Sequence, residues 1–131
     1  MKVEEYRKCI ERTYHCVTGM SASLTEGVAR TIAEELLEGC DVTIVDVVLI
    51  GSCAFGRETA KSDLDFLVYY KGDLKEYAVF NVLHDPNDQP ELSGRELDFN
   101  PKRLEESGTL EECLQQAWEY GNNSKLTCFT R

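Results

Sequence analysis

The stretch that decides the fold is residues 41–70, which read DVTIVDVVLI, then GSCAFGRETAKS, then DLDFLVYY. Residues 41–50 are rich in β-branched side chains, which predicts a strand, and their apolar density favours a central one. Residues 63–70 form a second apolar run and predict a second strand. Residues 51–62 begin with Gly-Ser and predict a turn with one short helix between the two strands.

Two amphipathic segments precede this stretch. Apolar residues recur at three- and four-residue spacing over residues 2–18, which predicts a helix ending at Gly19. The sequence from Ser23 to Glu26, SLTE, matches a capping box, so we expect a second helix to begin there and to end near Gly39.

After the second strand, the pattern favours a short helix over residues 73–83, opened by another possible capping box, DLKE. The run YAVFNVL at residues 77–83 is equally compatible with a strand, because short apolar runs are ambiguous by periodicity. Residues 91–100 predict a small hairpin that turns at Ser93 and Gly94.

Pro101 is acceptable in the first turn of a helix, so we expect it to start the last helix. That helix is expected to break near Gly108, and the tail after Gly121 is expected to fray. The whole order indicates an α+β fold, with a small mixed β-sheet packed against helices on one side. With no repeat and no linker, residues 1–131 are interpreted as a single domain.

The composition limits the possible functions. The formal net charge is -10, from 14 Lys and Arg against 24 Asp and Glu, which argues against nucleic-acid binding through bulk charge. No apolar run approaches the length of a membrane span, and the first residues lack the apolar core of a signal peptide, so a cytoplasmic location is expected. The 6 cysteines show no C-x-x-C spacing and are interpreted as reduced apolar side chains.

Three aspartates occupy strand positions where carboxylates can meet. Asp63 and Asp65 alternate with Leu64, so both are predicted to point to one face of the sheet, and Asp98 alternates in the same way between Leu97 and Phe99. If the two strands are neighbours, the three carboxylates converge. Bare carboxylates this close would raise one another's pKa, and Mg²⁺ with a bound triphosphate would relieve the repulsion.

The Gly51-Ser52 pair lies at the end of the first strand. Glycine there lets the backbone approach a phosphate, and the following amides and the Ser52 hydroxyl can donate to phosphate oxygens. Each half of this pattern has an ordinary structural explanation when taken alone. The combination of Gly-Ser, ten intervening residues and Asp-x-Asp is far less common by chance.

The segment GSCAFGRETAKSDLDFLVYY resembles the minimal nucleotidyltransferases of the DNA polymerase beta superfamily, and RELDFNP resembles the strand that carries their third carboxylate. The resemblance covers about residues 41–105. The matching positions are Gly51, Ser52, Gly56, Ser62, Asp63, Asp65 and Asp98. Cys53 departs from the pattern, since the family commonly has Arg or another larger residue there.

The resemblance implies the nucleotidyltransferase fold and a set of roles. Asp63, Asp65 and Asp98 would be catalytic and would bind two Mg²⁺ ions, with Asp98 also activating the acceptor hydroxyl. Gly51, Ser52 and Ser62 would bind the nucleotide. The implied reaction transfers a nucleoside monophosphate from an NTP, with ATP expected, to a hydroxyl acceptor and releases pyrophosphate.

Small members of this family often act with a helical partner protein in toxin–antitoxin modules, and a protein side chain is a possible acceptor. The alternative hypothesis is a nucleotide-binding or partner-binding module of the same fold with weak or no catalysis.

Other residues have weaker functional signals. His15 and His84 are lone histidines, for which surface or capping roles are expected. Arg57 and Lys61 could meet the triphosphate or be solvated loop charges, and Glu96 is interpreted as a strand-edge charge. The aromatic residues near the C-terminal end could stack on a base, although packing is the default; they are Trp118, Tyr120 and Phe129.

Overall fold

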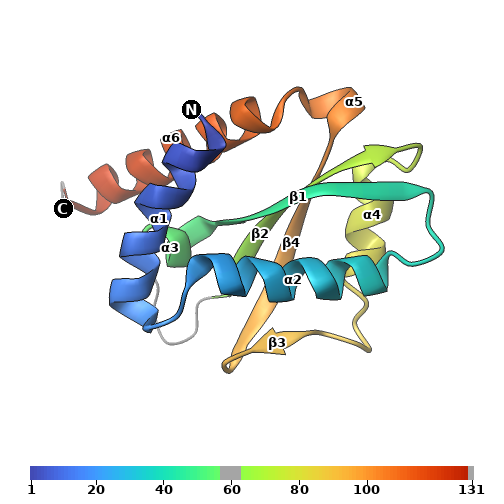
Figure 1. The fold of residues 1–131 in the computed structure, drawn as a ribbon, viewed down its shortest axis with the longest axis horizontal. Helices are drawn as coiled ribbons and strands as arrows, with labels where there is room; N and C mark the ends of the chain where they lie inside the picture. The colour runs from blue at the N-terminus through green and yellow to red at the C-terminus, as the bar shows by residue number, and fades with distance from the viewer. Residues whose placement is uncertain (57–62, 130–131) are drawn as a thin grey trace.

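A mixed sheet of four strands in the order β1-β2-β4-β3 organises the computed structural model, which describes residues 1–56 and 63–129 (Figure 1). β1 pairs antiparallel with β2, β2 pairs parallel with β4, and β3 pairs antiparallel with β4. The strands are β1 (Val42–Ile50), β2 (Leu64–Gly72), β3 (Glu91–Leu92) and β4 (Arg95–Arg103). The α+β class with a mixed sheet is confirmed.

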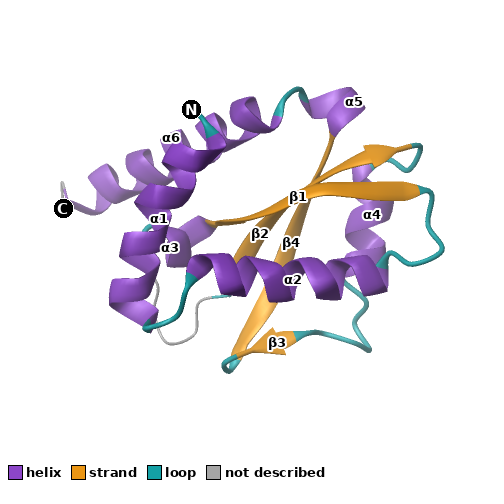
Figure 2. Cartoon of the chain, viewed as in Figure 1, coloured by secondary structure: helices purple, strands orange, loops and turns teal. Residues whose placement is uncertain are grey.

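Six helices, counted over the described residues, pack around this sheet (Figure 2). α2 packs on β1, α4 packs on β4, and the two helices also contact each other, so they cover the same face. α1 contacts both α2 and α6, and the Met1 amino group donates to Gln115 Oε1 at 3.0 Å. The helices are α1 (Val3–Thr18), α2 (Ala22–Leu36), α3 (Gly51–Ala54), α4 (Glu76–Leu83), α5 (Leu104–Ser107) and α6 (Leu110–Phe129).

The prediction that residues 41–50 form a central strand is wrong, because β1 lies at the edge of the sheet. A run of β-branched residues predicts that both faces of a strand are buried. It does not predict whether the strand has a neighbouring strand on one edge or on both. The outward-facing backbone of β1 is covered by side chains from the helices. Tyr6 Oη donates to Leu49 O at 2.8 Å, and Leu49 N–H donates to Glu26 Oε2 at 2.7 Å.

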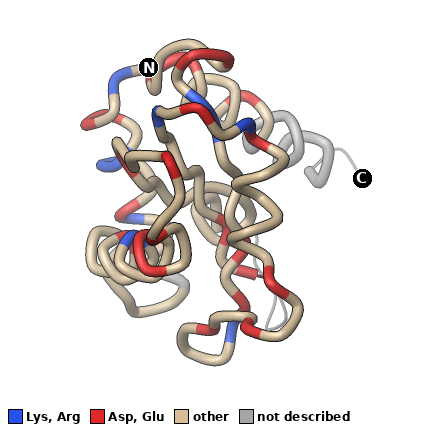
Figure 3. Tube along the Cα trace, turned by 90° about the vertical axis from the view of Figure 1, so that its right-hand side faces the viewer, with Lys and Arg blue, Asp and Glu red and all other residues tan. Residues whose placement is uncertain are grey.

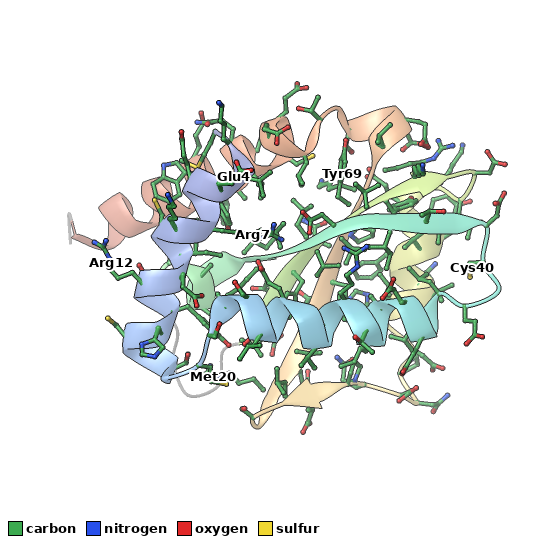
Figure 4. All side chains as sticks on the ribbon, in the orientation of Figure 1. Glu4, Arg7, Arg12, Met20, Cys40 and Tyr69 are labelled. Atoms are coloured by element: carbon green, nitrogen blue, oxygen red, sulfur yellow. The ribbon has the colours of Figure 1, made fainter. Side chains whose placement is uncertain are left out.

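Arg7 joins the same network from α1, where its side chain points toward β1 (Figure 4). Its Nε lies 3.1 Å from Glu26 Oε1, and its Nη2 lies 2.9 Å from Asp46 Oδ1. The Glu26 carboxylate is buried, so the ion pair and the Leu49 amide together compensate its charge. These contacts fix the end of β1 that leads directly into the Gly51 turn.

Both predicted capping boxes are wrong. Ser21 is the N-cap of α2, and its hydroxyl accepts from Leu24 N–H at 3.3 Å, whereas Ser23 lies inside the helix. α4 begins after Lys75, which makes no side-chain cap, and residues 77–83 are helical rather than extended. Glu26 and Glu76 are engaged in tertiary contacts instead, and these compete with the local capping bonds.

Pro101 was expected to start the last helix, and this prediction is wrong because Pro101 lies within β4 and is buried. β3 pairs only with Arg95 and Glu96, so at Pro101 the β4 strand has one neighbour, Val68 of β2. A strand with one free edge tolerates a residue that has no N–H to donate. The expected break at Gly108 is confirmed, since α5 ends before it and α6 begins after it.

The hairpin between β3 and β4 is confirmed with its predicted turn. Ser93 has φ 54° and Gly94 has φ 79°, which are the positive values that a tight two-residue turn requires. The expected fraying after Gly121 differs from the structure, in which α6 continues to Phe129.

Acidic positions are spread over the coloured part of the trace, with fewer basic positions among them (Figure 3). No helix among the described residues has the length and hydropathy to cross a membrane. In the described part of the chain, the thiols of Cys9, Cys16, Cys40 and Cys113 are free.

Candidate active site

A cavity of about 710 Å³ lies between the β1–α3 turn, the strands β2 and β4 and the helix α6, and Phe80 of α4 also lines it. One wall is the turn from β1 into α3, the floor is β2 and β4, and the other wall is the first part of α6. Its polar lining residues are Ser52, Asp65, Asp98, Asn100, Lys102, Gln116 and Tyr120. The predicted phosphate turn and two of the predicted aspartates therefore line one cavity.

Gly51 starts α3 with φ +80°, a backbone conformation that favours glycine. A Cβ atom at this position would lie 2.9 Å from both Cβ and Cγ of Asp65 and closer still to its Oδ2. The turn can therefore approach Asp65 only because residue 51 has no side chain. The structure places Gly51 and Ser52, the two residues of the predicted phosphate turn, at the same cavity as Asp65.

Asp65 and Asp98 are direct partners in the parallel register of β2 and β4, so their side chains leave the same face side by side. Burial raises the pKa of Asp65 to about 7, and a hydrogen bond with Asp98 and the charges of Asp98 and Asp63 act in the same direction. In the described part of the chain no Lys or Arg forms an ion pair with Asp65. Among the described residues, the charge of Asp65 is therefore offset by no Lys or Arg.

Asp63 lies outside this pair. Asp63 immediately precedes β2, which begins at Leu64, and it is exposed, although its charge still contributes to the raised pKa of Asp65. Across residues 1–56 and 63–129, no three His, Cys, Asp or Glu side chains are grouped closely enough to hold a metal ion. Ser62, Arg57 and Lys61 lie outside the described residues.

Cys53 fixes the backbone next to Asp63. The thiol is fully buried and donates to Asp63 O at 3.3 Å, which ties α3 to the residue before β2. The residue that departs from the family pattern therefore has a structural contact in this chain.

A family model for the nucleotidyltransferase domain matches residues 29–128. The chain belongs to the nucleotidyltransferase domain family. The match includes the whole sheet, the Gly51 turn and α6 up to residue 128. Comparisons with curated proteins and with solved structures return no match.

The donor chemistry of this candidate site fits a divalent cation such as Mg²⁺. Carboxylate oxygens are the ligands that Mg²⁺ prefers, and Asp65 and Asp98 place two carboxylates side by side at the cavity. Asp65 and Asp98 would be the first ligands, and Asp63 would have to approach them to complete the expected set of three.

His84 also contacts the candidate active site, which its sequence context did not predict. Its expected capping role is confirmed, since it is the C-cap of α4 and its Nδ1 lies 2.8 Å from Phe80 O. In addition, its Nε2 lies 2.8 Å from Asp98 Oδ1. No periodicity or motif marks it, because it is the residue that follows α4 and reaches Asp98 only through the tertiary fold. Asn100 and Lys102 were also not predicted, although they follow Asp98 at alternate positions of β4 and so share its face.

The aromatic candidates divide into two groups. Trp118 packs edge-to-face against Phe55 at 5.6 Å and against Tyr6 at 6.3 Å between ring centroids, so it belongs to the hydrophobic core. Tyr120 lines the cavity and is 73% exposed, which leaves its ring open to a ligand. The side chain of Phe129 lies outside the described part of the structure.

Proposed function

We propose that this protein is a Mg²⁺-dependent nucleotidyltransferase that moves a nucleoside monophosphate from an NTP, with ATP expected, to a hydroxyl acceptor. The observation that carries the proposal is the meeting of the Gly51 turn with Asp65 and Asp98 at one cavity. The family supplies the reaction class, and the cavity supplies a place where a triphosphate and an acceptor can be held together.

In the proposed reaction, the acceptor oxygen attacks the α-phosphorus of the NTP. The bond from that phosphorus to the bridging oxygen breaks, and pyrophosphate leaves. The acceptor proton passes to the Asp98 carboxylate, which is half exposed and therefore accessible from the cavity. Mg²⁺, when bound, supplies positive charge that stabilises the negative charge on the phosphates.

The remaining roles follow the cavity lining. Ser52 and the backbone after Gly51 would donate to the β- and γ-phosphates, and Ser62 would add a further contact. Asp65 and Asp63 would hold the metal ions together with Asp98. The Gly51 turn and Asp65 lie in contact, so the triphosphate and its metals would bind next to one another.

The acceptor is proposed to be a hydroxyl on a protein side chain, such as tyrosine, presented by a helical partner protein as in toxin–antitoxin modules. Exposed aromatic side chains support this part of the proposal: Phe80 and Tyr120 line the cavity and are 44% and 73% exposed. We propose that this takes place in the cytoplasm.

The test is transfer of label from α-³²P-NTPs with Mg²⁺, offered in turn to purified candidate acceptor proteins and to a cell lysate. Transfer that is lost in Asp65→Asn and Asp98→Asn but kept in the exposed-site control Asp88→Asn supports catalysis. Tight, Mg²⁺-dependent NTP binding without transfer to any acceptor would instead favour the alternative, a nucleotide-binding or partner-binding module. Absence of both would overturn the proposed site.

A further inference from the structure

The imidazole of His84 is held from several directions next to the candidate active site. Its Nε2 lies 2.8 Å from Asp98 Oδ1, and its Nδ1 lies 2.8 Å from Phe80 O. A carbonyl oxygen only accepts, so Nδ1 carries a hydrogen in this contact. The backbone N–H of Phe99 points to Nε2 from 3.1 Å.

Aromatic packing restricts the ring further. The Phe80 ring stacks on His84 with centroids 3.9 Å apart and planes at 29°, and the Phe99 ring contacts it edge-on at 6.2 Å. The His84 side chain is 16% exposed, whereas the Asp98 side chain is 50% exposed. A mostly buried group that several contacts hold in place therefore touches a carboxylate that is half exposed.

Asp98 needs such a contact because of its neighbour. Asp65 is its register partner, and two carboxylates side by side repel when both are ionised. With half of its side chain in solvent, Asp98 could rotate away from Asp65. The contact with His84 engages Oδ1 and leaves Oδ2 without this constraint, so the carboxylate keeps one orientation toward the cavity.

We propose that His84 is a positioning residue that holds the Asp98 carboxylate beside Asp65 in the active cavity. This role rests on the proposed function, because the orientation of Asp98 matters only when it binds metal or accepts the acceptor proton. Residues that orient carboxylate ligands in this way typically contribute about 10- to 100-fold to metal affinity or to activity.

Three substitutions of His84 separate its contacts. Gln places its amide group at the same number of bonds from Cα as Nε2, so the amide can still contact Asp98 and accept from the Phe99 N–H. Asn places its amide at the position of Nδ1 and can still donate to Phe80 O. Phe keeps the ring packing and loses all three polar contacts. The control is His15→Gln, at the exposed histidine of α1.

The experiment measures kcat and KM for the NTP at saturating Mg²⁺, and the dissociation constant of Mn²⁺ by electron paramagnetic resonance without substrate. We expect His84→Phe and His84→Asn to lower kcat about 10- to 100-fold, with KM changed less than about threefold, and to weaken Mn²⁺ binding about 10-fold. His84→Gln should remain within about fivefold of wild type in both readouts, because its amide can keep the contacts that Nε2 makes with Asp98 and with the Phe99 N–H.

The outcomes separate this role from a purely structural one. If Gln and Asn variants lose activity equally, in proportion to their loss of thermal stability, the positioning role is overturned. It is also overturned if His84→Phe leaves kcat and the Mn²⁺ constant within twofold of wild type. If the wild type binds Mn²⁺ but transfers no label, the proposed function fails while the Mn²⁺ constants still decide the His84 role. If the wild type binds no Mn²⁺, both proposals fail.

Discussion

The backbone of Gly51 lies directly against the side chain of Asp65. A Cβ at residue 51 would come within 2.9 Å of two carbon atoms of that side chain, and the backbone there has φ +80°. The contact joins the end of β1 to the start of β2, and it places the proposed phosphate turn next to a proposed metal ligand. The consequences of this contact can be tested directly.

Gly51→Ala is expected to reduce label transfer at least 100-fold and to lower the free energy of unfolding by about 2–4 kcal/mol, from backbone strain and from displacement of Asp65. Gly19→Ala is the matched control, because Gly19 has φ +75° but nothing lies within 4 Å of its added Cβ. It should lose only about 1 kcal/mol and keep full activity. Equal activity loss in both variants would show that strain alone, rather than contact with Asp65, is responsible.

Asp65→Asn is expected to stabilise the protein at pH 8 in the absence of divalent metal. The pKa of Asp65 is about 7 when folded, against an ordinary value of 3.8, so the folded state binds more protons between these pH values. The stability contributed by protonated Asp65 is complete below about pH 4 and is lost as pH rises through 7. After allowance for solvent screening, we expect a gain of about 1–2 kcal/mol at pH 8.

Urea unfolding at pH 4.5 and at pH 8 measures this effect, with Asp88→Asn as the exposed control. The free energies of unfolding of the wild type and of Asp65→Asn should converge at pH 4.5. Addition of Mg²⁺ at pH 8 should raise the melting temperature of the wild type and leave that of Asp65→Asn nearly unchanged. A variant that is less stable than wild type at pH 8 would contradict the electrostatic interpretation.

Glu26→Gln is expected to lower the free energy of unfolding by about 2–3 kcal/mol. One Glu26 oxygen accepts from Leu49 N–H at 2.7 Å and the other contacts Arg7 Nε at 3.1 Å, and an amide cannot accept at both positions. The control is Glu34→Gln, which removes an exposed pair with Arg30 at 3.8 Å and should cost less than about 0.5 kcal/mol. Urea denaturation of both variants decides the comparison, and similar losses would contradict a special role for the buried network.

Lys102→Met is expected to raise the KM for the NTP or the acceptor about three- to tenfold, with little change in stability. Lys102 lines the cavity and forms no ion pair with any described residue, so its charge is available to an anionic ligand. Lys71→Met, at the far end of β2 on an exposed position, is the control. Steady-state kinetics with each substrate varied in turn identify which substrate Lys102 contacts. Unchanged KM values for both the NTP and the acceptor would show that Lys102 binds neither.

Local sequence signals predicted most elements but not their caps or neighbours. The β-branched run of residues 41–50 and the apolar run after Asp63 form strands, and Ser93 with Gly94 forms the expected turn. The errors share one cause. A serine in a capping-box pattern, or a proline at a position that suits a first helical turn, shows only that such a local structure is possible. Tertiary contacts decide whether it forms. Glu26 and Pro101 show this most clearly.

The sequence by itself predicted that residues 51, 52, 63, 65 and 98 form one site, from a glycine at a strand end and carboxylates at alternating strand positions. Only the tertiary structure decided that Asp65 and Asp98 are register partners, since the β2–β4 pairing joins residues far apart in the chain. It alone decided that Asp63 falls outside the strand and that His84 contacts Asp98. Side-chain spacing along a chain predicts which face a residue uses, but contact between faces depends on how separate elements pack.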